Sequence, residues 1–299
     1  MEQQRQAYLY ALIVVLLWAT VASAFKISLR YLSFFPLVLF ASIVSTIVLL
    51  LILTLQGKFA MLFQYSRRQY VASALLGLLN PFLYYIVLFK AYSLLPAQQA
   101  QPLNQTWAIV LPLLSILILK QRIAPKSIIA ILISFVGVVL ISTQGRILNL
   151  RFTSTPGVLL ALGSAFVWAL FWLGNVRDRR DDVAKLFLNF LSGSLFLILA
   201  DVLFLRVALP SGPGLLGAAY VGLIEMGIAF VLWLKALRLS RTTAQVSNMV
   251  YLVPFLSLVV INFAVGEKIH LSTLVGLMFI VAGILIQQRS SKQLNARSP

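Results

Sequence analysis

One carboxylate lies inside a long apolar stretch of this sequence. Glu225 stands in the run VGLIEMGIAFVLWLKALRLS, which covers residues 221–240. If a membrane helix begins near Gly214, eleven residues at about 1.5 Å each place Glu225 roughly 16 Å deep, near the centre of a hydrocarbon core about 30 Å thick. An ionised side chain there costs on the order of 2.5–3.5 kcal/mol on insertion scales, so it must be paired, protonated or exposed to water. The sequence therefore predicts a polar pathway at Glu225; the alternative is a buried acid that only bonds a neighbouring helix.

Amide side chains occur in other apolar stretches. Asn80 precedes Pro81, and a proline frees a backbone carbonyl one turn earlier, which is tolerated beside a cavity or a neighbouring helix. This pair is therefore either a binding kink or a packing kink. Gln101, Gln105 and Asn248 lie near the starts of two further stretches. They are either helix caps or, as we favour, parts of a cavity wall, because amides are poorly solvated in lipid.

Aromatic residues and one lysine complete the candidate site. Five aromatic residues lie within the apolar stretches, away from the ends where an interfacial belt would place them: Trp18, Tyr84, Trp168, Trp172 and Trp233. They are either packing residues or the walls of a site that attracts apolar or cationic groups. Lys26 lies late in the first stretch, so it either reaches the outer interface as a headgroup anchor or belongs to the candidate site.

The composition excludes several other kinds of chemistry. The chain is 61% hydrophobic and only 10% charged, whereas soluble domains carry about 25% charged residues, so this is a membrane protein. It has no cysteine and a single histidine, His270, so we expect no disulfide and no metal site. The HExxH, GxSxG and Walker patterns do not occur in the sequence. We therefore expect no enzyme activity and no cofactor.

The distribution of charge predicts an orientation in the membrane. Ten apolar stretches of roughly the ~20 residues that a spanning helix needs can be separated: residues 7–29, 34–55, 70–93, 97–119, 127–144, 156–176, 183–205, 214–237, 243–265 and 271–287. With the N-terminus in the cytoplasm, 17 of the 24 Lys and Arg residues fall on the inner side. This bias is typical of membrane topology, so the net charge of +17 does not indicate nucleic acid. We expect a multi-pass protein of the cell (inner) membrane with both termini cytoplasmic. Three acids in one inner loop, Asp178, Asp181 and Asp182, are expected only to solvate it.

The two halves of the sequence repeat. GLLNPFLYYIVLFKA from Gly77 aligns with GLIEMGIAFVLWLKA from Gly222, and this alignment pairs Asn80 with Glu225. Because a five-helix unit has an odd number of spanning helices, its second copy must insert in the opposite membrane orientation. Inverted repeats are typical of secondary transporters, which bind substrate near the midplane between the repeats. We therefore predict an all-α integral membrane protein with ten transmembrane helices in two inverted five-helix repeats, residues 1–146 and 152–299.

Several motifs resemble those of the drug/metabolite transporter superfamily, EamA branch. They are LLWATVASAFK in the first stretch, KAYSLLPA and KALRLS after the third and eighth, and VGEKI before the last. The resemblance covers nearly the whole chain and is specific for fold and transporter class, not for substrate. One departure is that Gly266-Glu267 fits the family pattern, whereas Lys120-Gln121 stands at the corresponding place in the first half.

The resemblance implies a secondary transporter, more commonly an exporter, of amino-acid-like or drug-like metabolites that works by alternating access. Its partners would be a small-molecule substrate, the lipid bilayer and protons, and the sequence leaves monomer and homodimer open. Glu225 would bind a proton or a cation, amides would supply hydrogen bonds and tryptophans apolar walls. The alternatives are an uncoupled facilitated exchanger, a non-transporting membrane scaffold or a channel.

Overall fold

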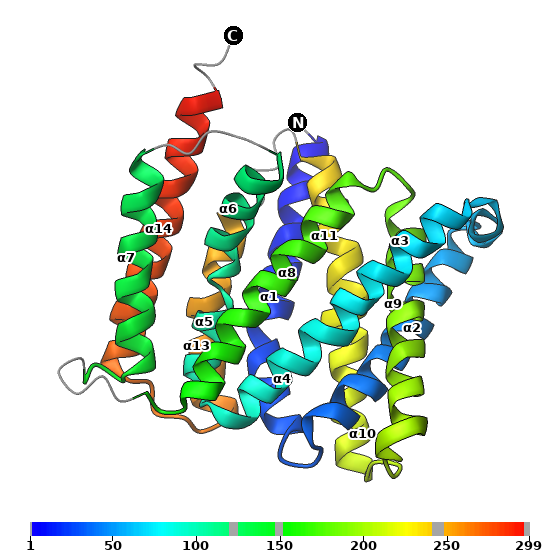
Figure 1. Ribbon diagram of the computed structural model, residues 1–299, viewed down its shortest axis with the longest axis horizontal. Helices are drawn as coiled ribbons and strands as arrows, with labels where there is room; N and C mark the ends of the chain where they lie inside the picture. Colours follow the sequence, from blue (N-terminus) through cyan, green and yellow to red (C-terminus); the bar gives the residue numbers. More distant parts are fainter. Residues whose placement is uncertain (1, 120–124, 147–151, 241–247, 296–299) are drawn as a thin grey trace.

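All the regular structure in the described part of the chain is helical (Figure 1). The computed structural model describes residues 2–119, 125–146, 152–240 and 248–295. Each of the ten predicted stretches contains helix. Six helical spans are long and apolar enough to cross a membrane: Glu2–Ser28, Phe34–Leu55, Arg67–Leu94, Thr155–Asn175, Asp182–Leu205 and Gly212–Ala236. The other apolar helices are shorter or broken, and the predicted class, an all-α multi-pass membrane protein, is confirmed.

The first half contains two interrupted helices. Its elements are α1 (Glu2–Ser28), α2 (Phe34–Leu55), η1 (Phe59–Gln64), α3 (Arg67–Gly77), η2 (Leu78–Leu83), α4 (Tyr84–Leu94), α5 (Ala97–Asn104), α6 (Trp107–Leu119) and α7 (Pro125–Ser142). The π-type segment η2 joins α3 to α4, and Asn80 within it leaves helical geometry at φ −150° and ψ 120°. Pro81 has no N–H to donate and cannot continue a regular helix. A second break at Gln105 and Thr106 separates α5 from α6.

The second half repeats this pattern. Its elements are α8 (Thr155–Arg177), α9 (Asp182–Ala200), η3 (Asp201–Leu205), α10 (Gly212–Tyr220), η4 (Val221–Ile228), α11 (Ala229–Leu239), η5 (Asn248–Leu252), α13 (Val253–Ala264) and α14 (Leu271–Asn295). The π-type segment η4 joins α10 to α11 as η2 joins α3 to α4, and it contains Glu225. Segments of this kind are rare and occur frequently at functional sites.

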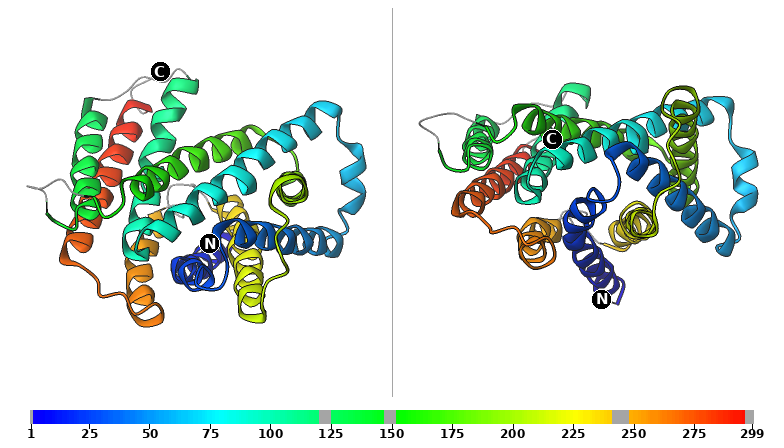
Figure 2. Two further views of the ribbon diagram at one scale, coloured as in Figure 1. Left: turned by 60° about the horizontal axis from the view of Figure 1, so that its bottom comes forward. Right: turned by 90° about the horizontal axis from the view of Figure 1, so that it is seen from below.

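The two halves pack through matching pairs of helices (Figures 1 and 2). Helix α1 lies against α11 and α13, and its counterpart α8 lies against α4 and α6. Helix α2 packs on α9 and η4, α9 also packs on η2, and α7 and α14 form a pair at one edge of the molecule. In Figure 1, α1 descends from the end marked N whereas α8 ascends toward it. These two helices therefore run in opposite directions, as an inverted repeat requires.

Two glycines at matched positions let the central helices cross closely. A Cβ on Gly77 would meet the backbone oxygen of Asn189 in α9, and a Cβ on Gly222 would meet the backbone oxygen of Ala41 in α2. Small residues at such crossings are a main route to tight packing between membrane helices. These crossings hold η2 against α9 and η4 against α2.

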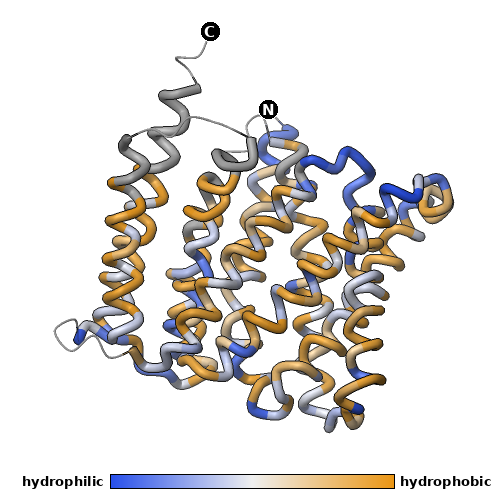
Figure 3. Tube along the Cα trace, viewed as in Figure 1, coloured by the Kyte–Doolittle hydropathy of each residue, from blue (hydrophilic) through white to orange (hydrophobic). Residues whose placement is uncertain are grey.

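The expectation that the three acids between α8 and α9 only solvate their loop is wrong. Each acid forms an ion pair: Asp181 with Lys58 at 2.7 Å, Asp178 with Arg180 at 2.5 Å and Asp182 with Lys185 at 2.8 Å. Burial favours a higher pKa for the Asp178 carboxyl, but hydrogen bonds and charge from Arg180, with the charge of Lys185, hold that pKa below its ordinary value. The loop thus ties the end of α2 to α9, at a helix end where Figure 3 shows hydrophilic residues gathered.

We expect Gly77→Ala and Gly222→Ala each to destabilise the fold. The added methyl group would have to displace backbone rather than a flexible side chain, and overpacking of this kind typically costs about 1–3 kcal/mol. The measurement is the thermal midpoint of the purified protein in detergent. Gly163→Ala in α8 is the control, because a Cβ there meets nothing within 4 Å. Midpoints as high as that of the control in both variants would contradict the close crossings.

Candidate functional site

A cavity lies between the two halves. It holds about 540 Å³ of empty space, including its opening to solvent. Helices of both halves supply its lining, as expected for a site at a repeat interface. The lining residues are Trp18, Val21, Ala22, Phe25, Tyr84, Leu88, Tyr92, Gln101, Asn104, Gln105, Trp107, Trp168, Glu225, Val250 and Val253.

Glu225 supplies the one carboxylate among the described residues that line this cavity. Its side chain is buried in η4, and Tyr85 donates a hydrogen bond to Oε1 at 3.2 Å. The indole of Trp18 lies beside the same carboxyl without an aligned hydrogen bond. Oε2 is buried and has no hydrogen-bond partner in the described part of the chain. Buried polar atoms are nearly always bonded, so Oε2 marks a place for a ligand, an ion or water.

Amide groups from α5 and its C-terminal end form the polar side of the cavity. Asn104 is held in place, because it accepts a hydrogen bond from the Tyr84 hydroxyl at 3.3 Å and donates one to Ser164 Oγ at 2.8 Å. Gln101 Oε1 and Gln105 Nε2 are buried without a partner among the residues the structure describes. The wall therefore offers one free acceptor and one free donor.

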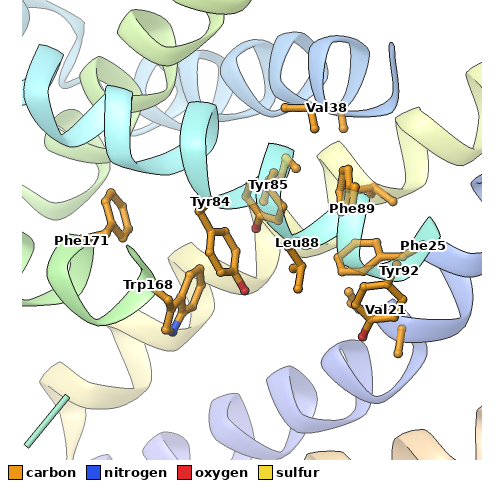
Figure 4. Close-up of a cluster of buried hydrophobic side chains, with 14 of the residues drawn as sticks. Val21, Phe25, Val38, Tyr84, Tyr85, Leu88, Phe89, Tyr92, Trp168 and Phe171 are labelled. Atoms are coloured by element: carbon orange, nitrogen blue, oxygen red, sulfur yellow. The ribbon is translucent and has the colours of Figure 1, made fainter. Parts of the chain in front are cut away.

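Aromatic rings form another part of the lining, and Trp168 contacts several of them. Its ring centroid lies 4.6 Å from that of Tyr84, 5.5 Å from Phe230 and 6.5 Å from Trp107. Figure 4 shows Tyr84 and Trp168 side by side, and Tyr92, further along α4, beside Phe25 of α1. Tilted and edge-on contacts at these distances stabilise aromatic clusters, so this wall is stiff.

The structure places six of the eleven predicted site residues on this cavity: Trp18, Tyr84, Gln101, Gln105, Trp168 and Glu225. Two more, Trp172 and Trp233, do not line the cavity themselves but contact rings that do. The centroid of Trp172 is 5.7 Å from that of Trp168, and the centroid of Trp233 is 5.5 Å from that of Trp18. The side chain of Asn248 lies outside the described residues.

Asn80 and Lys26 lie apart from the cavity lining. Asn80 is fully buried in η2, and neither atom of its amide has a partner among the described residues. Lys26 Nζ donates to the carbonyl oxygens of Tyr92 at 2.8 Å and Leu95 at 2.7 Å. Lys26 therefore caps the end of α4, a contact with protein rather than with a lipid headgroup.

Glu267 completes a clamp on the turn between α4 and α5. Its carboxylate oxygens accept from the backbone N–H groups of Ala97 at 2.8 Å and Gln98 at 3.1 Å. Negative charge at a helix N-terminus is favourable, which explains the acid of the Gly266-Glu267 motif. Lys26 bonds the C-terminal end of α4 and Glu267 bonds the N-terminal end of α5, so two opposite charges hold the turn between these helices.

Sequence reasoning missed several lining residues that share a helix face with a predicted one. Ala22 and Phe25 follow Trp18 by four and seven residues, which is the spacing of one helical face. Leu88 and Tyr92 follow Tyr84 by four and eight residues in the same way. Choosing residues by chemical type alone left out these positions, which helical periodicity would have identified.

An all-helical membrane bundle with a polar and aromatic cavity between inverted halves has the architecture of a membrane transporter. The chain belongs to the EamA-like transporter family, whose pattern matches residues 5–143 and 155–287. The predicted resemblance to the drug/metabolite transporter superfamily is confirmed.

Similar proteins cover either nearly the whole chain or about two thirds of it. The uncharacterized transporter YvbV of Bacillus subtilis (strain 168) is 26% identical across 99% of this chain and 95% of its own. An uncharacterized transporter in the sor 3′ region of Acidianus ambivalens is 32% identical across 69% of this chain and 80% of its own. An uncharacterized transporter of Clostridium kluyveri is 26% identical, and the match spans only 59% of its length. One solved crystal structure shares the fold, with a TM-score of 0.66 and 21% identity over 96% of this chain and 98% of that one.

We expect Tyr85→Phe to destabilise the protein through the Glu225 carboxyl. Removing a donor from a buried acceptor costs about 1–3 kcal/mol, and that cost should shrink when Glu225 is replaced by Met, which needs no donor. The measurement is a double-mutant cycle of thermal midpoints for Tyr85→Phe, Glu225→Met and the double variant. Additive losses would show that the two side chains do not interact.

Proposed function

We propose that this protein is a secondary transporter that exports small organic metabolites, amino-acid-like or drug-like, by alternating access. The single observation that carries the proposal is the cavity between the inverted halves, in which a buried carboxylate faces free amides and aromatic rings. Alternating access needs a site that both halves share, so that rocking one half against the other exposes it to either side.

The interrupted helices suit such rocking. The cavity is lined by residues of α1, α4, α5, α6, α8, η4 and the η5–α13 segment, so the breaks at η4 and Gln105 contribute to its lining, and η2 leads into the α4 residues that line it. Bulges and breaks concentrate bending at a few residues, as in the discontinuous helices of transporters. In the described conformation the clamp of Lys26 and Glu267 holds the α4–α5 turn, and opening at that end would release it.

We further propose that residues 1–146 and 152–299 are the two moving units, and that both termini are cytoplasmic. Helix α1 begins and α14 ends at the same end of the molecule (Figure 1). That end also carries Arg179 and Arg180 of the α8–α9 loop, and Lys and Arg residues favour the cytoplasmic side irrespective of nearby acids. Glu225 would bind the coupling proton or exchange it for a substrate.

We expect cells that produce the wild type to release a solute that empty cells retain, and we expect Glu225→Gln to reduce that release at least tenfold. The amide keeps the shape of the carboxyl but cannot carry the exchanged charge. The measurement is untargeted metabolite efflux at matched membrane levels, and Glu2→Gln, the same change at an exposed position on α1, is the control.

The outcomes of this experiment separate the alternatives. Equal release by wild type and Glu225→Gln would make Glu225 a structural acid. Release that ignores an imposed proton gradient would indicate an uncoupled exchanger. If neither protein releases a solute from cells, and neither shows flux in liposomes, transport would be contradicted and a membrane scaffold favoured.

A further inference from the structure

The described residues that line the cavity include an acidic side chain but no basic one. Among the described lining residues Glu225 is the one acid, and none is Lys, Arg or His. Lys26 is bonded to two carbonyl oxygens and lines a separate pocket with Glu267. A carboxylate brought into the cavity would therefore meet a like charge and no described cation, and burying an unpaired anion is costly.

The Glu225 carboxylate is fixed in one orientation by Tyr85. That tyrosine is fully buried, and its hydroxyl donates to Oε1. Oε2 remains without a partner among the described side chains. A single N–H donor bearing positive charge matches this arrangement, because charge-assisted hydrogen bonds are short and strong. Tyr85 does not line the cavity and acts through Glu225, so it is a positioning residue.

The aromatic wall favours the same kind of ligand. Trp18, Tyr84 and Trp168 line the cavity together with Glu225. Aromatic rings attract cations through their faces, and they also stack on flat apolar rings.

The unpartnered amide atoms of the lining can bind an uncharged polar group of the ligand. Gln101 Oε1 can accept one hydrogen bond and Gln105 Nε2 can donate one. Such a pair suits a hydroxyl or amide group on the ligand. It does not neutralise a full negative charge, since both groups are uncharged.

We infer that the cavity selects aromatic monocations, namely protonated amines attached to a flat ring, over zwitterionic amino acids and organic anions. The observations that carry this inference are the single carboxylate with one unpartnered oxygen, the aromatic wall and the missing basic side chains among the described lining residues. The inference rests on the proposed transport function for its biological meaning, but it is a statement about binding and can be tested without flux.

The test compares three probes that share a phenyl ring but differ in charge: the cation phenethylamine, the zwitterion phenylalanine and the anion phenylacetate. Binding to the purified protein is followed by tryptophan fluorescence, because Trp18, Trp107 and Trp168 line the cavity. We expect phenethylamine to bind at least tenfold more tightly than phenylalanine, and phenylacetate most weakly. Phenylalanine binding as tightly as phenethylamine would overturn the inference.

Two variants separate recognition from a general loss of structure. Glu225→Gln should weaken phenethylamine at least tenfold while leaving the neutral probe phenylacetamide within about twofold, because only the cation uses the charge. Tyr85→Phe should weaken phenethylamine several-fold with the same neutral probe unaffected. Equal losses for both probes would show that these residues only maintain the fold, which would contradict the inference.

Binding and transport can fail separately. Selective binding of phenethylamine without any efflux would support the inference and count against the proposed function. Efflux of phenylalanine at a rate equal to that of phenethylamine would support transport and overturn the selection of monocations.

Discussion

A carboxylate within a membrane bundle must be compensated, and the surroundings of Glu225 are arranged to do so. Ionised groups in hydrocarbon are expensive. Here one carboxylate oxygen bonds the buried Tyr85 hydroxyl, the other is buried without a partner among the described residues, and the residue itself lines a cavity shared by both halves. Glu225 therefore depends on Tyr85 and on the polar and aromatic lining of the cavity for its compensation.

The backbone supports this arrangement through matched interruptions. The segments η2 and η4 occupy equivalent places in the two halves. Gly77 directly precedes η2 and Gly222 lies within η4, and at both glycines a neighbouring helix crosses closely. The halves differ in what they place there. Glu225 lines the shared cavity, whereas the buried amide of Asn80 lies outside its lining. The pseudo-symmetry is therefore a property of the scaffold, while the chemistry belongs mainly to the second half.

The scaffold could be predicted from the sequence, and the site only in part. Apolar length and the repeat from Gly77 to Gly222 are local properties, so they predicted the helices and the depth of Glu225. The repeat places Asn80 and Glu225 at equivalent depths, but it does not fix the direction in which each side chain points. For this reason the pairing with Glu225 did not show whether Asn80 lines the cavity. The partners of Lys26 and Glu267 are backbone groups of a distant turn, and the ion pair of Asp181 with Lys58 joins distant loops. Contacts of this kind depend on how helices pack, which the sequence pattern does not contain.

The most direct test of the central claim uses the natural absence of cysteine from this chain. Ala22 lines the cavity with Glu225, whereas Ala165 is fully buried in helix packing away from it. In membranes open to reagent on both sides, Ala22→Cys should react with a membrane-impermeant thiol reagent and Ala165→Cys should not. Protection of Ala22→Cys by a transported solute would complete the predicted result. An Ala22→Cys variant as unreactive as Ala165→Cys would contradict a solvent-accessible cavity at Glu225.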